Sequence, residues 1–376
     1  MKKANKWRLG AVALASVMVL GACGGGGGNS ASSGSSAGGS EATGSSAAAT
    51  GDHSVALITD TGGVDDKSFN QSAWEGLQEW GKENNLKEGA GGFAYFQSQD
   101  AADYANHINT AVTNGFHTVF GIGYLLKNDI AAGADQFPDT NFGLIDEVIE
   151  GKDNVVSATF SDHEASYLAG IAAAYTTKTD KVGFVGGEEG AVIDRFEAGF
   201  TKGVADTAKK LNKEIEVDVQ YAASFSSPDK GKSIAASMYN NGADIIFHAS
   251  GGTGVGVFAE AIAKNEQKTK AELETDKVWV IGVDRDQDAD GKFKTKDGSD
   301  DNCTLTSTLK GVGAAVKDIS TRAMNDDFPG GEHLTYGLKD GGVDLTAGYV
   351  SDDAKAAIET AKQEIIDGKI EVPEKP

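Results

Sequence analysis

The stretch "TDTGGVDDKSFNQSAWEGL", Thr59 to Leu77, decides the fold because it joins a strand to a helix through a polar turn. The apolar run "VALI" before it is typical of a buried strand, and we expect a helix to begin near Phe69. Residues 60–68 hold three aspartates, two glycines and a lysine, and they lead into Phe69 and Asn70. Such a turn either caps its helix in solvent or forms the mouth of a ligand site.

The same alternation of strand and helix recurs along the chain from Ser54 onward. Most of the strand candidates are nearly continuous apolar runs, which indicates strands that are buried on both faces of a parallel sheet. Five candidates precede residue 161 and four more follow before residue 285: "SVALITD", "FAYFQS", "TVFGIG", "NFGLID", "VVSATF", "KVGFVGG", "EVDVQYA", "ADIIFHAS" and "VWVIGVD". The sequence therefore predicts an α/β protein with two doubly wound parallel-sheet lobes and a ligand cleft between them.

Candidate site residues stand where the predicted strands end. Ligands of open α/β sheets bind outside the carboxyl ends of the strands. Three of these ends carry an aspartate, namely Asp60, Asp146 and Asp284, and another leads into the turn "SGGTG" at 250–254. Each aspartate alone could simply cap the following helix, but the clustering of acceptors, glycines and aromatic residues at several strand ends favours a binding site.

The first residues have the features of a bacterial lipoprotein signal. Residues 1–22 combine a basic start with a short apolar run, and "LGAC" ending at Cys23 resembles a lipobox. We expect cleavage before Cys23 and acylation of its thiol. Residues 23–51, rich in Gly, Ser and Ala, should then form a disordered tether. The expected location is the extracytoplasmic face of the cell membrane, with the protein held there by lipid.

The charge of the chain excludes one class of partner. The formal net charge is -22, and loss of the four basic residues in 1–22 would take it to -26. Nucleic-acid binding needs a basic surface, and no basic stripe is present. Cys303 would be the one thiol left after lipidation, so an intramolecular disulfide is not expected.

Several segments together resemble the basic membrane protein (BMP) family of lipoproteins, the purine nucleoside receptors that feed ABC importers. The motifs are "ITDTGGVDDKSFNQSAWEGL", "FSDHEASYLAGIAAA", "KVGFVGG", "SGGTGVGVF", "VIGVDRDQ" and "TSTLKGV", in the family's order. The resemblance implies a type I periplasmic-binding-protein fold whose two lobes close on the ligand. It places residues 52–160 and about 303–330 in the first lobe, and residues 161–302 and about 331–376 in the second.

The resemblance also implies a set of ligand contacts. By motif position, Phe69 and Phe225 look like the two rings that stack on the nucleobase. Asp284 and Lys310 look like the pair that holds the ribose hydroxyls. The other positions similar to family contacts are Asp60, Asn70, Asp146 and the turn glycines Gly251 and Gly252. A flat base offers two faces for stacking, and a carboxylate can accept from both ribose hydroxyls, so the chemistry agrees.

A second candidate site is the acidic segment 284–297. Asp286, Asp288 and Asp290 match the start of a calcium loop, and Asp297 falls at its twelfth position, where a Glu is usual. No helix clearly leads into this segment, so an acidic surface insertion is the competing interpretation. No complete phosphate loop, dinucleotide fingerprint or zinc motif is present in the sequence, and no cofactor is expected.

Four functions remain open at this point. The first is a nucleoside-binding lipoprotein, with purines as the preferred bases, that delivers its ligand to the permease and ATPase subunits of an ABC importer. The second keeps the fold but binds a free sugar. The third is a surface sensor or adhesin without a transport role. The fourth, a nucleoside hydrolase, is disfavoured because the aspartates are scattered singly over the strand ends, so we expect that the protein is not an enzyme.

Overall fold

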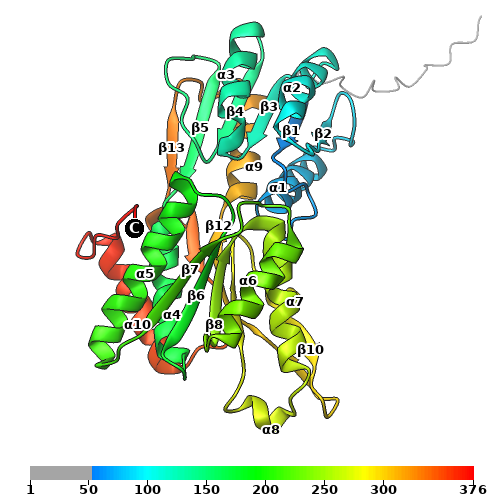
Figure 1. The fold of residues 1–376 in the computed structure, drawn as a ribbon. Helices are drawn as coiled ribbons and strands as arrows, with labels where there is room; N and C mark the ends of the chain where they lie inside the picture. Colours follow the sequence, from blue (N-terminus) through cyan, green and yellow to red (C-terminus); the bar gives the residue numbers. More distant parts are fainter. Residues whose placement is uncertain (1–52) are drawn as a thin grey trace, which may run out of the picture. The chain divides into compact units, whose positions relative to one another are not determined.

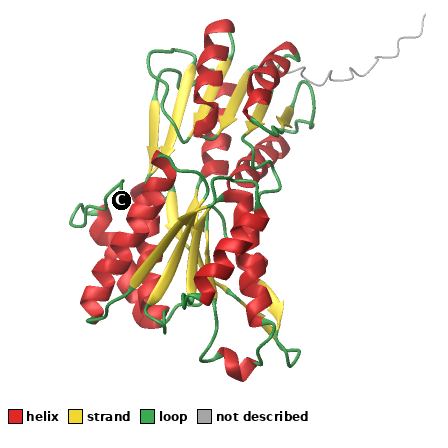
Figure 2. Ribbon diagram, in the orientation of Figure 1, coloured by secondary structure: helices red, strands yellow, loops and turns green. Residues whose placement is uncertain are grey.

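The computed structural model describes residues 53–376, so the predictions for the signal segment, Cys23 and the tether lie outside the described residues. The described part contains two six-stranded sheets and one small hairpin (Figure 1). In both large sheets the strands alternate along the chain with helices that pack beside them (Figure 2). The predicted two-lobed parallel α/β fold is therefore confirmed.

The first lobe holds the sheet β13-β5-β4-β3-β1-β2, in which every pair of neighbours is parallel. Its strands β1, β3 and β4 end at the residues that precede the predicted site positions. The elements are β1 (Val55–Thr59), α1 (Phe69–Glu83), β2 (Phe93–Phe96), α2 (Tyr104–Thr113), β3 (Thr118–Ile122), α3 (Lys127–Gln136), β4 (Asn141–Ile145), β5 (Val155–Phe160), α9 (Val312–Met324) and β13 (His333–Tyr336).

The second lobe holds the sheet β14-β12-β9-β8-β6-β7, which is parallel except for the antiparallel pair β12–β14. Its elements are α4 (Asp162–Thr176), β6 (Lys181–Gly186), α5 (Ala191–Leu211), β7 (Glu216–Tyr221), α6 (Pro228–Asn240), β8 (Ile245–Ala249), α7 (Gly254–Asn265), α8 (Lys270–Leu273), β9 (Trp279–Gly282), β10 (Lys292–Lys294), β11 (Asp300–Asn302), β12 (Thr304–Lys310), β14 (Val343–Leu345) and α10 (Asp352–Ile366).

The nine predicted strands are all present, and their burial follows the apolar pattern. Every residue of β1, β3 and β8 is buried, because helices cover both faces of the sheet. The edge strand β7 is only half-buried along its length. Single-turn 3-10 helices follow several strands, including η3 (Gly251–Thr253) after β8.

The chain passes between the lobes three times, and this corrects the expected boundaries. It crosses after β5, after β12 and after β13. The expected boundaries placed 303–330 in the first lobe and 331–376 in the second. However, β12 pairs with β9 in the second sheet, and β13 pairs with β5 in the first. Sheet membership is set by pairing between distant segments, which a local apolar pattern does not reveal.

Candidate ligand-binding site

A cavity lies between the carboxyl ends of the two sheets. Both lobes contribute to its wall: Asp60, Gly62, Asp66, Phe69, Asn70, Gly123, Tyr124 and Asp146 come from the first, and Val192, Ile193, Phe196, Phe225, Ala249, Ser250, Gly251, Val283, Asp284 and Lys310 from the second. Eight of the nine predicted ligand contacts therefore surround one space. The exception is Gly252, which does not line the cavity.

The turn between β1 and α1 is organised by Asp66. Its two carboxylate oxygens accept hydrogen bonds from the backbone N–H groups of Ser68, Asn70 and Gln71 at 2.9 to 3.1 Å. These are N–H groups of the first helical turn, which have no partner within the helix. Asp66 thus caps helix α1, whereas Asp60 makes none of these capping bonds and lies at the cavity wall. There its Oδ1 accepts from Asn70 Nδ2 at 2.7 Å and from the Gly62 N–H at 2.8 Å.

Asp146 and Asp284 occupy matching places in the two lobes. Asp146 directly follows β4, and Asp284 stands two residues after β9. Both have a left-handed backbone, with φ of 71° and 65° respectively, which is uncommon for residues other than glycine. Strained positions of this kind cluster at ligand sites, because the surrounding structure must hold them in place. The two carboxylates are thus fixed on opposite sides of the cavity.

Lys310 forms its ion pairs with two aspartates. Its Nζ lies 2.7 Å from Asp146 Oδ2 and 3.1 Å from Asp162 Oδ1, and Asp162 also receives the Arg195 guanidinium at 3.3 Å. Lys310 and Asp284 both line the cavity, so their expected role as the two contacts of a ribose stays a prediction. Burial alone would lower the pKa of Lys310, but the carboxylates of Asp146, Asp162 and Asp284 outweigh it and raise that pKa. The ammonium group is therefore charged, and its charge is already balanced.

Asp284 has a hydroxyl partner instead. Its Oδ2 accepts a hydrogen bond from Ser68 Oγ in the turn of the first lobe. Burial raises the pKa of Asp284 to about 7, and burial likewise raises the pKa of Asp60 to about 7. Both carboxyl groups lack a strong cationic partner in contact, so removal from water dominates. A ligand with hydroxyl or N–H donors would stabilise their ionised forms.

One side of the cavity is aromatic and aliphatic. Phe225, in the loop after β7, meets the ring of Tyr124 edge-on with 6.3 Å between ring centroids. Val192, Ile193 and Phe196 from the first turns of α5 continue this surface. Tyr124 thus gives Phe225 an aromatic neighbour from the other lobe. The Phe225 ring also leaves no room for a side chain at Gly187, because a Cβ there would stand only 2.2 Å from Phe225 Cε1.

Phe69, the other predicted stacking residue, lies beside Lys310. The Nζ of Lys310 is 5.2 Å from the centroid of the Phe69 ring and 5.1 Å from that of Phe160. Cation–π attraction of this kind helps to hold a buried ammonium in place. Phe69 thus lines the cavity and also packs against the lysine that balances Asp146.

Three buried polar atoms of the cavity wall have no hydrogen-bond partner within the described residues. They are Asn70 Oδ1, Tyr124 Oη and Asp146 Oδ1. Buried polar groups in native proteins are nearly always paired, so such atoms need a partner from elsewhere. Two of the three are acceptors only, and the tyrosine hydroxyl can donate or accept. A ligand with hydrogen-bond donors could therefore pair these atoms of the cavity wall.

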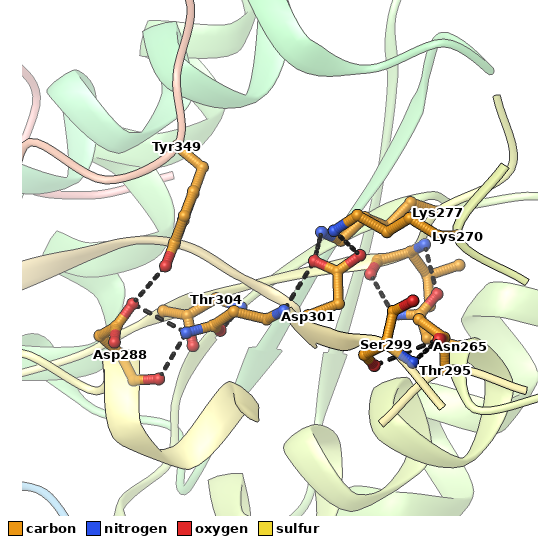
Figure 3. A network of polar contacts seen from close by, with 11 residues as sticks. Asn265, Lys270, Lys277, Asp288, Thr295, Ser299, Asp301, Thr304 and Tyr349 are labelled. Atoms are coloured by element: carbon orange, nitrogen blue, oxygen red, sulfur yellow. Dashed lines mark hydrogen bonds and ion pairs between the residues drawn. The ribbon is translucent and has the colours of Figure 1, made fainter. Parts of the chain in front are cut away.

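The proposed calcium loop does not form. Asp288 begins the 3-10 helix η4 (Asp288–Gly291), and its Oδ1 accepts from Asn302 Nδ2 and from Tyr349 Oη (Figure 3). Asp297 lies in the turn of the β10–β11 hairpin and accepts from Thr295. Within residues 53–376, no group of three or more His, Cys, Asp and Glu side chains is arranged to hold a metal ion. Strand β10 stands between Asp297 and the other three aspartates, Asp286, Asp288 and Asp290. This arrangement favours the interpretation as an acidic surface insertion.

Sequence reasoning missed several wall residues. Asp66 was one of three aspartates in a single turn, and only the hydrogen bonds identify it as the cap. Val192, Ile193 and Phe196 lie in the first turns of α5 and line the cavity. Tyr124 stands two residues after the end of β3. Its place after a strand end is the signal that could have identified it.

The fold and the cavity define the class of protein. Two parallel-sheet lobes around a cavity at the carboxyl ends of their strands form a type I periplasmic-binding-protein fold. The chain is similar in fold to a solved ABC transporter solute-binding protein from Aeropyrum pernix K1, with a TM-score of 0.73 and 24% identity over 85% of this chain and 93% of that one. This likeness is one of fold.

The chain belongs to the Bmp family of PnrA-like ABC transporter substrate-binding proteins, whose family model matches residues 53–376. It is 49% identical to the ABC transporter nucleoside-binding protein BmpA of Lactococcus lactis subsp. cremoris, over 98% of both chains. It is 50% identical to a CD4+ T-cell-stimulating antigen of Listeria monocytogenes, over the full length of both. The family resemblance noted in the sequence motifs is confirmed.

Membership also defines the general role. Substrate-binding proteins of this kind present a ligand to the permease and ATPase subunits of an ABC transporter, outside the cytoplasm. They are binding proteins and not enzymes. Across residues 53–376, the structure contains no helix with both the length and the apolar character that crossing a membrane requires.

Proposed function

We propose that the protein captures nucleosides, with purine nucleosides preferred, and delivers them to an ABC importer. The single observation that carries this proposal is the composition of the cavity wall. The wall combines aromatic and aliphatic side chains, among them Phe225 and Tyr124, with the buried carboxylates of Asp60, Asp146 and Asp284. A nucleoside has the same two parts, a flat base and a ribose with neighbouring hydroxyl groups.

The physical argument concerns each half of the ligand. Stacking of a base on an aromatic ring contributes roughly 1–3 kcal/mol of binding free energy, and this holds for every base because each has a π-face. The ribose hydroxyls donate to carboxylate oxygens, and hydrogen bonds to a charged acceptor are about twice as strong as neutral ones. The unpartnered oxygens of Asn70 and Asp146 supply further acceptors for N–H groups of a base. The relative from Lactococcus lactis, named as nucleoside-binding, supports the same ligand class.

The test is a calorimetric and thermal-shift panel on the protein without its signal segment. Adenosine, guanosine, inosine, cytidine and uridine are compared with adenine, free ribose and glucose. We expect the purine nucleosides to bind and to raise the melting temperature, because a ligand that binds only the native state stabilises it. Binding of a free sugar without any nucleoside would favour a sugar receptor. Failure of the whole panel would favour the sensor or adhesin, and release of hypoxanthine from inosine would indicate a hydrolase.

The membrane anchor is a separate part of the proposal and rests on "LGAC" ending at Cys23. Acylation of Cys23 would hold the protein on the extracytoplasmic face of the membrane through the Gly/Ser/Ala-rich segment 23–51. Labelled palmitate should enter the wild-type protein, and the Cys23→Ser protein should stay unlabelled and remain uncleaved or be released. Label in the Cys23→Ser protein would show that the anchor lies elsewhere.

A further inference from the structure

One hydrogen bond between the lobes connects the turn after β1 to the loop after β9. Gln287 belongs to the second lobe, and its Nε2 donates to the carbonyl oxygen of Lys67 in the first lobe at 2.9 Å. Gln287 is 2% exposed, whereas Lys67 is exposed, so the bond is buried on the side of its donor. Lys67 has a left-handed backbone with φ of 60°, a conformation that is unfavourable for a lysine unless contacts hold it.

The same glutamine is tied to a buried histidine. Gln287 Oε1 accepts from the Val283 N–H at 2.8 Å and lies 3.0 Å from His248 Nε2. Because that oxygen can only accept, His248 must carry its proton on Nε2. Its Nδ1 then accepts from the Ser250 hydroxyl at 3.3 Å. Ser250 lines the ligand cavity, so a continuous chain of hydrogen bonds runs from the cavity wall to the opposite lobe.

Each link of the chain is fixed by its own lobe. The backbone N–H of Gln287 donates to Ser307 Oγ at 3.1 Å, and its carbonyl accepts from Thr304 Oγ1 at 3.0 Å. His248 packs edge-on against Phe258, and a Cβ on Gly254 would stand 2.1 Å from its Cε1. Burial also lowers the pKa of His248 to about 4, which keeps the ring neutral and preserves its single donor. Contacts within the second lobe therefore hold both Gln287 and His248 in their present orientations.

From this geometry we infer that Gln287 and His248 are positioning residues of a latch between the lobes. The latch, Lys67–Gln287–His248–Ser250, stabilises the arrangement in which the lobes enclose the cavity, and it couples that arrangement to whatever occupies the cavity beside Ser250. The inference goes beyond the proposed function and does not require that the ligand be a nucleoside. Weakening the latch should lower the fraction of binding-competent protein, and the apparent affinity falls by that fraction.

Two substitutions of Gln287 separate the latch from the packing of the second lobe. Gln287→Glu keeps an oxygen for His248 and Val283 but replaces the donor that reaches Lys67. Gln287→Met removes every hydrogen bond of the side chain while keeping its length. The matched control is Glu75→Gln, because Glu75 also bridges the lobes, to Arg285 at 3.5 Å, but at an exposed position. Exposed ion pairs contribute little, so this control should behave as the wild type does.

The first measurement is hydrogen exchange on the full chain in detergent, without ligand. Both Gln287 variants should exchange about three- to tenfold faster over residues 60–68, as expected for loss of one net hydrogen bond. In Gln287→Glu, which keeps an oxygen for His248 and Val283, exchange in β8 and β9 should stay unchanged. Wild-type exchange over 60–68 in both variants would overturn the latch. Equal acceleration in β8 and β9 of Gln287→Glu would also overturn it, because it would show that Gln287 only stabilises the second lobe.

The second measurement is the affinity for inosine, and only this arm rests on the proposed function. Both variants should bind about three- to tenfold more weakly than the wild type and the Glu75→Gln control. If wild-type protein does not bind inosine, the proposed function fails and the exchange experiment alone decides on the latch. If inosine binds all four proteins equally, the coupling between cavity and latch is wrong.

Discussion

Asp284 combines three properties at one position: a left-handed backbone, a buried carboxyl group and a hydrogen bond from Ser68 in the other lobe. Asp146 shares the first two properties on the opposite side of the cavity. The left-handed backbone and the burial each lower the stability of the empty protein, the first by strain and the second by desolvation. Residues that break local rules in this way mark functional sites, because function maintains what folding alone does not favour.

The first prediction at this scale concerns pH. The folded pKa values of Asp60 and Asp284 lie near 7, above the usual value of 3.8, so the native state binds more protons than the unfolded state between about pH 4 and pH 7. Their contribution is therefore fully present below pH 4 and is lost as the pH rises through 7. It amounts to at most about 1.4 kcal/mol per pH unit for each group.

Urea unfolding of ligand-free protein at pH 5.5 and 7.5 tests this linkage. Asp60→Asn and Asp284→Asn should each become more stable relative to the wild type at pH 7.5 than at 5.5, by about 2 kcal/mol. Comparing variant with wild type cancels His248, whose lowered pKa acts in the opposite sense. Parallel stability curves for wild type and both variants would mean that these carboxyls ionise normally.

The second prediction concerns the ribose. Asp284→Ala should weaken nucleoside binding by roughly 2–4 kcal/mol, because it removes a charge-assisted acceptor and leaves the donors of the ligand unpaired. A 2′,3′-dideoxynucleoside should lose a similar amount with the wild-type protein. Calorimetry on both pairs measures this directly. If ribo and dideoxy ligands bind the wild type equally, Asp284 does not read the sugar.

At the scale of elements, helices α4 and α5 of the second lobe pack so closely that their backbones touch. A Cβ on Gly203 would stand 2.2 Å from the Tyr167 carbonyl oxygen, and a Cβ on Gly170 would stand 2.4 Å from that of Phe200. This contact sets the position of α5, whose first turns supply Val192, Ile193 and Phe196 to the cavity wall. Glycine is required here by proximity, although it is a poor helix former.

Gly203→Ala should therefore destabilise the protein by about 1–3 kcal/mol, since overpacking outweighs the gain of about 1 kcal/mol in helix propensity. Lys209→Ala, at an exposed position of the same helix, is the control and should change stability by less than about 0.5 kcal/mol. Denaturant unfolding of both variants gives the two values. A Gly203→Ala protein as stable as the wild type would show that the two helices can move apart freely.

The strands were predictable because each is a short apolar run bounded by turn residues. Sheet membership of β13 was not predictable, since it is a four-residue strand whose partner β5 lies far away in sequence, and the short apolar pattern of β12 does not show which sheet it joins. For the same reason the polar sequence 284–302 gave no sign of the β10–β11 hairpin. Local pattern identifies an element, but pairing over long distances decides where that element goes.

The site was predictable to a similar degree. Asp60, Asp146 and Asp284 follow from strand ends, and the family motifs added Phe69, Phe225 and Lys310. The ion pair between Lys310 and Asp162 was not predicted, because Asp162 opens α4 and its sequence position indicates only an acidic first turn. A charged residue at a helix start has the same sequence signature whether it meets solvent or a buried lysine.

At the scale of the whole molecule, the charge of the chain and that of the cavity have the same sign. The full chain carries -22, and the cavity wall contains Asp60, Asp66, Asp146 and Asp284 against the single cation Lys310. That lysine is already paired with Asp146 and Asp162, and the nearby Arg195 is paired with Asp162. Within the described part of the cavity wall, no cation is left to meet an anionic ligand.

The last prediction follows from this balance: adenosine or guanosine binds, and the corresponding 5′-monophosphate does not. A phosphate would bring about two negative charges into a water-poor site lined by carboxylates, and like charges placed together there cost several kcal/mol. The measurement is titration of nucleoside and monophosphate into the same protein at one salt concentration. As a control, Asp60→Asn should narrow the gap between the two ligands, because it removes one carboxylate of the cavity wall. A monophosphate that binds the wild type within tenfold of its nucleoside would show that Lys310 or Arg195 can leave its aspartate partners to meet the phosphate.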